Sequence, residues 1–171
     1  VALVQGGGPQ GTRKTDDSVI QVFERHLEAT DLVEPPVDLV VWPEDVIDTD
    51  GPFVDDAWAE VIGELARQLD APIIVGTVEG AGPDAFTNSA VLVDASGEVI
   101  DRYDKVHRVP FGEFVPFRSL LEVVAGDALP DRDARIGELP AHLDVPGPVG
   151  RVSTPISREM FFPDSTREGV E

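Results

Sequence analysis

The chain opens with three short apolar runs that alternate with two segments of helical periodicity. The runs are Val1 to Gln5, Asp38 to Trp42 and Pro72 to Gly76. Between them, apolar residues recur every three or four positions from Asp16 onward and again from Val54 to Leu69. Short apolar runs are typical of buried strands, and the longer periodicity is typical of amphipathic helices. The first half of the chain is therefore predicted to be β-α-β-α-β.

The pattern then changes to two neighbouring strands. Thr87 to Val93 and Glu98 to Tyr103 are both strand-like, and the run Asp94 to Gly97 between them is rich in turn-forming residues. Two strands joined in this way form an antiparallel hairpin. A β-α-β-α-β unit followed by a hairpin predicts an α/β layered fold whose sheet mixes parallel and antiparallel pairs.

The segment 104–149 has little regular pattern. It holds one short helix candidate, Ser119 to Val124, and is otherwise rich in proline, glycine and aspartate. A connection of this length inside a compact domain is usually functional or mobile, so we expect a long loop over a site. Gly150 to Ser157 is predicted to be the last strand, weakened by its serine, threonine and proline.

Composition narrows the class of protein. The 171 residues carry 33 Asp and Glu against 13 Lys and Arg, a formal charge of -20. That charge argues against nucleic-acid binding and against electrostatic docking to anionic lipid. The chain has no cysteine, which excludes disulfides, thiolate metal sites and thiol nucleophiles. No apolar run approaches the roughly 18 residues of a membrane span, and the start at Val1, without Met, is expected of a piece of a longer protein.

Three polar residues lie at predicted strand ends. Glu44 follows the strand that ends in Trp42-Pro43, Lys105 follows the hairpin, and Ser157 ends the last strand. Each of them alone is more often an ordinary surface or structural residue. Together, a carboxylate, an ammonium and a hydroxyl at the carboxyl ends of strands match the base, oxyanion stabiliser and nucleophile of an acyl-transfer site. We also expect the indole of Trp42 to shield the Glu44 carboxylate from water.

The chain resembles the nitrilase (carbon–nitrogen hydrolase) superfamily and, within it, the extracytoplasmic domain of bacterial apolipoprotein N-acyltransferases. The matching pieces occur in family order along the whole chain: Val4-Gln5-Gly6, Trp42-Pro43-Glu44, Asn88-Ser89-Ala90, Tyr103-Asp104-Lys105, Val109 to Phe117, and Ile156-Ser157-Arg158-Glu159. The Val-Pro-Phe-Gly-Glu-aromatic-Val-Pro-Phe run is the most specific and points to the acyltransferase branch. The resemblance implies an α-β-β-α sandwich with a mixed sheet, spread over a partial domain of residues 1–171.

The resemblance also implies roles for individual residues. Glu44 matches the general base, Lys105 the residue that stabilises the tetrahedral oxyanion, and Glu113 a second glutamate that positions the lysine. Glu159 matches a glutamate two residues after the nucleophile. In this branch a cysteine takes an acyl group from a phospholipid and passes it to the N-terminal amine of an apolipoprotein. The implied location is the extracytoplasmic face of the bacterial plasma membrane, reached through flanking segments that this sequence does not contain.

The sequence departs from the family pattern in two places. Ser157 stands where the family has its nucleophilic cysteine, and Arg158 stands where an aromatic residue is common. An engineered change, a degenerate natural copy and a natural serine variant all remain open. The chain also ends about 14 residues after Ser157, before the second half of the family's sandwich. A sandwich incomplete on its C-terminal side leaves a sheet edge uncovered, so we expect a chain that is marginally stable, self-associating or inactive.

The apolar residues of the long loop are expected to face lipid, namely Phe111, Phe114, Val115 and Phe117.

Two alternative functions remain open. They are a soluble nitrilase-family amidase and a non-catalytic binding module of the same fold. The histidines and acidic pairs lack the spacing of metal sites, and Gly6-Gly7-Gly8 lacks the lysine of a phosphate loop. We therefore predict no metal and no cofactor.

Overall fold

The computed structural model describes residues 1–8, 15–125, 129–138 and 140–167. Its elements follow one another in the order β1 (Ala2–Leu3), α1 (Asp16–Thr30), β2 (Val40–Val41), β3 (Ile47–Thr49), η1 (Phe53–Asp55), α2 (Ala57–Leu69), β4 (Ile73–Gly80), β5 (Ala85–Val93), β6 (Val99–Asp104), α3 (Arg118–Ala125), β7 (Asp133–Ala134), β8 (His142–Val145), β9 (Gly150–Ser153), η3 (Ser157–Phe161) and α4 (Pro163–Arg167). Within the described ranges, no helix combines the length and the apolar character needed to cross a membrane.

The main sheet is mixed, as predicted. Its strands run in the order β1-β2-β4-β5-β6, with β3 alongside β4 and β7 alongside β5. β1, β2 and β4 are parallel, whereas β4, β5 and β6 are antiparallel neighbours. The parallel half comes from the β-α-β-α-β unit and the antiparallel half from the hairpin. The predicted α/β class is confirmed.

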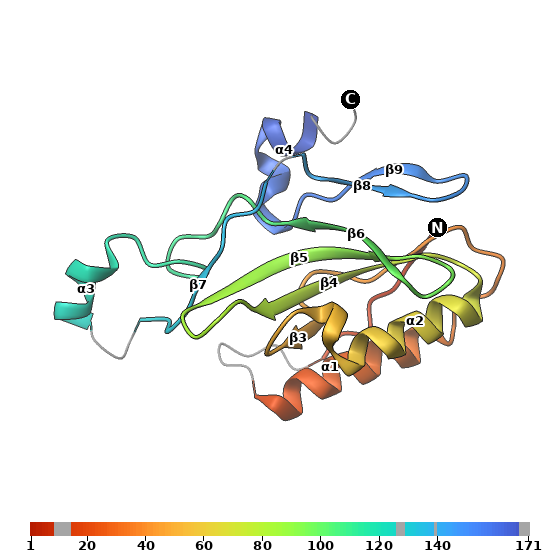
Figure 1. Cartoon of the computed structure of the whole chain (residues 1–171), viewed down its shortest axis with the longest axis horizontal. Helices are drawn as coiled ribbons and strands as arrows, with labels where there is room; N and C mark the ends of the chain where they lie inside the picture. Colours follow the sequence, from red (N-terminus) through yellow and green to blue (C-terminus); the bar gives the residue numbers. More distant parts are fainter. Residues whose placement is uncertain (9–14, 126–128, 139, 168–171) are drawn as a thin grey trace.

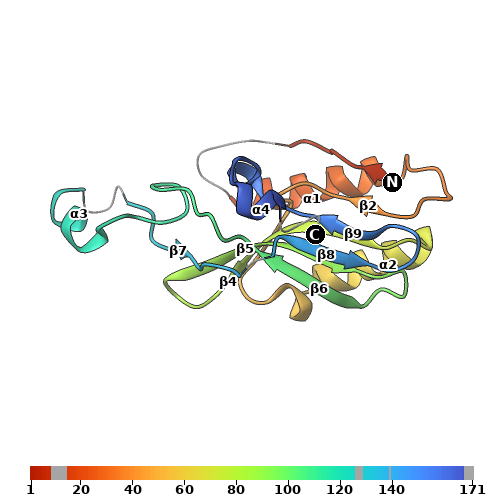
Figure 2. The ribbon, with the colours of Figure 1, turned by 90° about the horizontal axis from the view of Figure 1, so that it is seen from above.

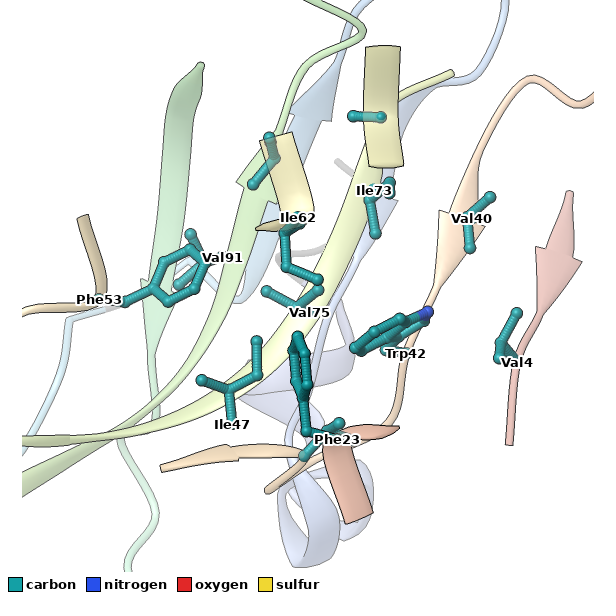
Figure 3. Close-up of a cluster of buried hydrophobic side chains, with 13 residues drawn as sticks. Val4, Phe23, Val40, Trp42, Ile47, Phe53, Ile62, Ile73, Val75 and Val91 are labelled. Atoms are coloured by element: carbon teal, nitrogen blue, oxygen red, sulfur yellow. The ribbon is translucent and has the colours of Figure 1, made fainter. Parts of the chain in front are cut away.

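The two long helices cover one face of the sheet (Figure 1). Thr15 caps α1 in a capping box with Ser18, and Asp56 caps α2 by accepting a hydrogen bond from the Trp58 amide at 3.0 Å. The apolar sides of these helices meet the sheet in a core that includes Phe23 and Trp42 (Figure 3). Burial of this apolar area holds the helical layer against the sheet.

The opposite face of the sheet is covered by the hairpin of β8 and β9 (Figures 1 and 2). A second core cluster lies between them, with Ile74, Leu92 and Tyr103 on the sheet and Leu143 and Val145 on the hairpin. The layers therefore run helix, sheet, hairpin. The expectation that segment 104–149 has little regular structure is therefore wrong for β8. This strand pairs with β9, which lies beyond the expected boundary at residue 150, so the pattern within the segment alone did not predict the hairpin.

The segment 104–149 also contains α3 and β7. α3, close to the predicted helix from 119 to 124, projects from one end of the molecule in both views (Figures 1 and 2). β7 returns the chain to the sheet, where it pairs in parallel with the start of β5. The expected strand from 150 to 157 was also too long: β9 ends at Ser153, and Ser157 begins the short helix η3 instead.

Candidate active site

The turn that carries Glu44 is fastened to the neighbouring strand β4. The amide of Trp42 donates to the carbonyl of Ile74 at 2.8 Å, and the amide of Val46 donates to the carbonyl of Gly76 at 3.1 Å. A Cβ on Gly76 would overlap with the carbonyl of Pro43 and lie 2.6 Å from Cα of Glu44. Only a glycine lets the Trp-Pro-Glu turn approach this closely.

The indole of Trp42 has a different role from the one expected. It is 1% exposed, its ring packs against Phe23 and His26, and its Nε1 donates to Oγ1 of Thr30 at 3.0 Å. These partners all belong to α1, so the ring is held in the core of the helical face. Trp42 therefore anchors the strand before Glu44 rather than shielding the carboxylate.

Lys105 lies at the centre of the site. It follows β6, and its amide donates to the carbonyl of Asn88 at 2.9 Å. Its Nζ donates to Oε1 of Glu44 at 3.1 Å and to Oε1 of Glu113 at 2.6 Å, and the residue is only 2% exposed. Burial alone lowers the pKa of this amine, but the hydrogen bond to Glu113 and the charge of Glu44 together raise it. Lys105 is therefore a buried cation.

The carboxylate of Glu113 is held at both of its oxygens. Oε1 accepts from Lys105 and, at 3.3 Å, from Nδ2 of Asn88, while Oε2 accepts from the amide of Val109 at 2.8 Å. Asn88 also donates to Oε1 of Glu44 at 2.8 Å. No role for the Asn88 side chain was predicted from the sequence. The available signal was its place in the Asn88-Ser89-Ala90 piece that matches the family pattern.

Ser157 is placed beside this cluster, without a direct bond to it. Ser157 and Glu44 line the same pocket of about 290 Å³, whose other walls include Val41, Ile74 and Ile156. In the described part of the chain, the Ser157 hydroxyl makes no hydrogen bond, and the residue is exposed. Its φ of 54° lies in the left-handed region that favours glycine. Residue 157 is thus presented on a sharp turn at the rim of the pocket.

Glu159 joins this turn to the segment that follows Lys105. The residue is completely buried, and its Oε1 accepts from the Tyr103 hydroxyl at 2.9 Å and from the amides of Val106 and His107 at 2.8 and 2.9 Å. Its Oε2 accepts from the amide of Ile156 at 2.8 Å. One carboxylate therefore sets the position of the residue before Ser157 relative to the residue after Lys105.

The loop residues expected to face lipid divide into two groups. Phe111 and Phe117 are 61% and 83% exposed. Val115 is only 4% exposed, because its amide donates to Asp133 and draws this part of the loop inward, so the expectation is wrong for Val115. Phe114 is half-buried with the guanidinium of Arg108 stacked 4.3 Å from its ring centre, which leaves it a poor candidate for lipid contact.

A second pocket, of about 410 Å³, also borders the cluster. Glu44 lines it as well, together with Asn88, Glu113 and Phe86. Glu44 thus lines two cavities, and the cavity shared with Ser157 has the more apolar walls. A carboxylate, a buried ammonium and a hydroxyl in this arrangement have the components of covalent acyl transfer.

The sequence matches the carbon–nitrogen hydrolase family over residues 1–169. It is 32% identical to the apolipoprotein N-acyltransferase of Allorhizobium ampelinum and 34% identical to that of Geobacter metallireducens, each over 99% of this chain. The chain spans about a third of the length of these relatives, 34% and 33% respectively.

Two solved structures share the fold. A carbon–nitrogen hydrolase from Helicobacter pylori superposes with a TM-score of 0.61 at 18% identity, over 96% of this chain and 53% of its own. An amidase from Nesterenkonia sp. superposes with a TM-score of 0.57 at 20% identity, over 97% of this chain and 58% of its own. The sequence match over nearly the whole chain and the nitrilase-type fold agree: this chain belongs to the carbon–nitrogen hydrolase family.

Proposed function

We propose that this chain is the acyl-transfer domain of an apolipoprotein N-acyltransferase. In this proposal it takes an acyl group from a phospholipid ester and passes it to the N-terminal amine of an apolipoprotein, at the extracytoplasmic face of the bacterial plasma membrane. The observation that carries the proposal is the Glu44-Lys105-Glu113 cluster beside the pocket of Ser157. The names of the relatives supply the substrate class.

The contacts of the two glutamates support different roles for them. Both oxygens of Glu113 are engaged, so its carboxylate orients Lys105. Glu44 uses only Oε1 for its two hydrogen bonds, and among the described residues its Oε2 makes none. Glu44 is therefore the better general base, because one of its oxygens is available to receive a proton.

The proposed reaction has two halves that share one covalent intermediate. Oγ of Ser157 attacks the ester carbonyl, Glu44 takes the hydroxyl proton, and the ammonium of Lys105 stabilises the oxyanion. The tetrahedral intermediate collapses, and the departing alcohol takes the proton from Glu44. The acceptor amine then attacks the acyl-serine ester, Glu44 receives the amine proton, and Oγ of Ser157 leaves and regains it. The net result is one ester broken and one amide formed.

Serine at position 157 makes this chemistry slow. A thiol ionises near pH 8.5 and is within reach of a carboxylate base, whereas a hydroxyl is a much weaker acid. The thioester that a cysteine forms is also a more reactive acyl carrier than the ester formed by serine. We expect Ser157→Cys to raise acyl transfer about ten-fold or more, because the rest of the cluster is already assembled.

The test uses the purified protein with phospholipid vesicles as donor and a diacylglyceryl-cysteine peptide as acceptor. Ser96→Cys introduces a thiol on the exposed turn between β5 and β6, outside the Ser157 pocket, and serves as the matched control, which should leave the rate unchanged. If neither the original chain nor Ser157→Cys transfers an acyl group, the proposal fails. In that case a non-catalytic binding module becomes the better assignment, and the hydroxyl at position 157 favours it. Hydrolysis of simple amides by Ser157→Cys would instead identify an amidase.

Exposed apolar side chains between residues 111 and 120 support a lipid contact. Phe111, Phe117 and Leu120 are each more than half exposed. Since the chain carries a charge of -20, contact with a bilayer must come from apolar side chains rather than from attraction to anionic lipid. Phe117→Asp should weaken binding to zwitterionic vesicles in a flotation assay. Leu32→Asp, at a residue that is 81% exposed elsewhere, is the control, and equal loss in both variants would remove the lipid role.

A further inference from the structure

Asn88 contacts the other members of the cluster through both its side chain and its backbone. Nδ2 donates to Oε1 of Glu44 at 2.8 Å and to Oε1 of Glu113 at 3.3 Å. The carbonyl of Asn88 accepts from the amide of Lys105 at 2.9 Å. The residue is 6% exposed and lies on β5, so it is held by a central strand of the sheet.

These contacts close a ring of two donors and two acceptors. Oε1 of Glu44 and Oε1 of Glu113 each accept from Nζ of Lys105 and from Nδ2 of Asn88. Without Asn88, two carboxylates of like charge would share one ammonium and repel each other. The amide adds a second donor between them without adding charge.

The orientation of the amide is fixed by the same surroundings. Exchanging its oxygen and nitrogen would place an oxygen lone pair against two carboxylates. In the present orientation Oδ1 of Asn88 is buried and, within the described part of the chain, has no hydrogen-bond partner. A buried acceptor without a partner costs free energy. The two hydrogen bonds that Nδ2 donates to the carboxylates therefore have to offset the cost of the unpaired Oδ1.

The ring also determines which oxygen of Glu44 remains available. Lys105 and Asn88 both bind Oε1, and Oε2 makes no hydrogen bond among the described residues. We propose that Asn88 is a positioning residue that, together with Lys105, holds Oε1 of Glu44 and so reserves Oε2 as the proton acceptor in the Ser157 pocket. The assignment of Glu44 as a base rests on the proposed function, whereas the coupling of Asn88 to the two carboxylates does not.

The coupling is tested without any activity, by urea unfolding of the chain at neutral pH. Asn88→Asp places three carboxylates around one ammonium, so it should lower the urea midpoint strongly. In a Glu113→Gln background one of the repelling charges is gone, and the same substitution should cost less than half as much. In an Asp144→Asn background the cost should be unchanged, because Asp144 is an exposed residue of the hairpin paired with Arg151.

Equal cost in all three backgrounds would mean that Asn88 only fills space, and the proposal would be overturned. If Asn88→Asp does not fold, Asn88→Ala is carried through the same backgrounds. Additive losses of Asn88→Ala and Glu113→Gln then overturn the proposal, whereas coupling between them supports it.

The positioning role is tested by kinetics in the original chain or in Ser157→Cys, whichever transfers acyl groups. Asn88→Ala should lower kcat by about 100-fold, because a small displacement of a catalytic group has an effect of that size. KM should stay within about two-fold, since Asn88 does not bind substrate in this proposal. A change in KM with kcat unchanged would overturn it. Absence of transfer in both proteins would instead sink the proposed function, and the urea experiment would still decide the coupling.

Discussion

Glu159 shows how one buried carboxylate connects segments that are far apart in the sequence. It accepts hydrogen bonds from Tyr103, Val106 and His107 on one side and from Ile156 on the other. Charge-assisted hydrogen bonds of this kind are stronger than neutral ones, and loss of a buried partner leaves several donors unsatisfied. Glu159 therefore fixes the turn of Ser157 relative to the strand end that carries Lys105.

The pH dependence of this connection is visible through Tyr103, the only tyrosine of the chain. Burial, and then the hydrogen bond and charge of Glu159, raise the Tyr103 pKa far above its usual value. The unfolded chain ionises near pH 10, while the folded chain keeps the phenol neutral. This group therefore contributes stability that is complete below about pH 10 and is lost as the pH rises further.

We expect phenolate absorbance to appear only together with the loss of circular dichroism during an alkaline titration. The measurement records both signals on one sample. Ionisation of Tyr103 near pH 10 in a chain that keeps its circular dichroism would contradict the buried Tyr103–Glu159 hydrogen bond.

At the residue scale, the sequence predicts the charged members of the site better than the neutral one. Glu44 and Lys105 follow strands, and Glu113 lies in a distinctive motif, so pattern and resemblance both identify them. Asn88 lies inside a strand, and its two carboxylate partners come from loops that only the folded chain brings beside it. The left-handed conformation of Ser157 also has no local signal, because serine rarely adopts it.

At the element scale, the close contact between the Trp-Pro-Glu turn and β4 sets the position of Glu44. The contact depends on Gly76, where a side chain would meet the backbone of Pro43 and Glu44. Since backbone atoms cannot move aside as a side-chain tip can, a Cβ at this position must displace the whole turn.

Gly76→Ala should lower the free energy of unfolding by about 1–3 kcal/mol and displace Glu44 from Lys105. Gly51→Ala is the matched control, because a Cβ there meets nothing within 4 Å, and its effect should stay within about 0.5 kcal/mol. Urea unfolding of the two variants gives both values. Equal stability of Gly76→Ala and the original chain would contradict the close approach of the turn.

The predicted elements were reliable where they were long and periodic. α1 and α2 and the hairpin of β5 and β6 lie close to their predicted ranges. β3 and β7 were missed because each is only two or three residues long and exists through its pairing with a distant strand. Pairing of this kind depends on the assembled sheet rather than on a local pattern.

At the scale of the whole molecule, β1 is an edge strand, and within the described ranges no strand pairs with its outer side. Leu3 on β1 is 80% exposed, and Val1 just before the strand is 70% exposed. Leu3 is in register with Val41 and, through β2, with Ile74, which belongs to the core beneath the hairpin. The apolar face of the sheet thus continues past the area that β8 and β9 cover, and it ends in a strand edge that can pair with another chain.

We expect the purified chain to self-associate through this edge at high concentration. Leu3→Asp places a charge on the uncovered face, so the molecular mass measured by light scattering should shift toward that of the monomer. Leu32→Asp changes an equally exposed leucine away from the sheet and should have no such effect. A monomer at every concentration, or an equal shift in both variants, would contradict an association through β1.

The left-handed backbone conformation of Ser157 lowers the stability of the folded chain. A residue with a Cβ in this conformation is disfavoured by about 1–2 kcal/mol, and glycine would remove that penalty. In the proposed function, glycine would also remove Oγ, the atom of this residue that carries the acyl group. Selection for heat-resistant variants should therefore enrich Ser157→Gly, and the same substitution should abolish the proposed acyl transfer, so thermal stability and reactivity place opposite demands on one backbone angle.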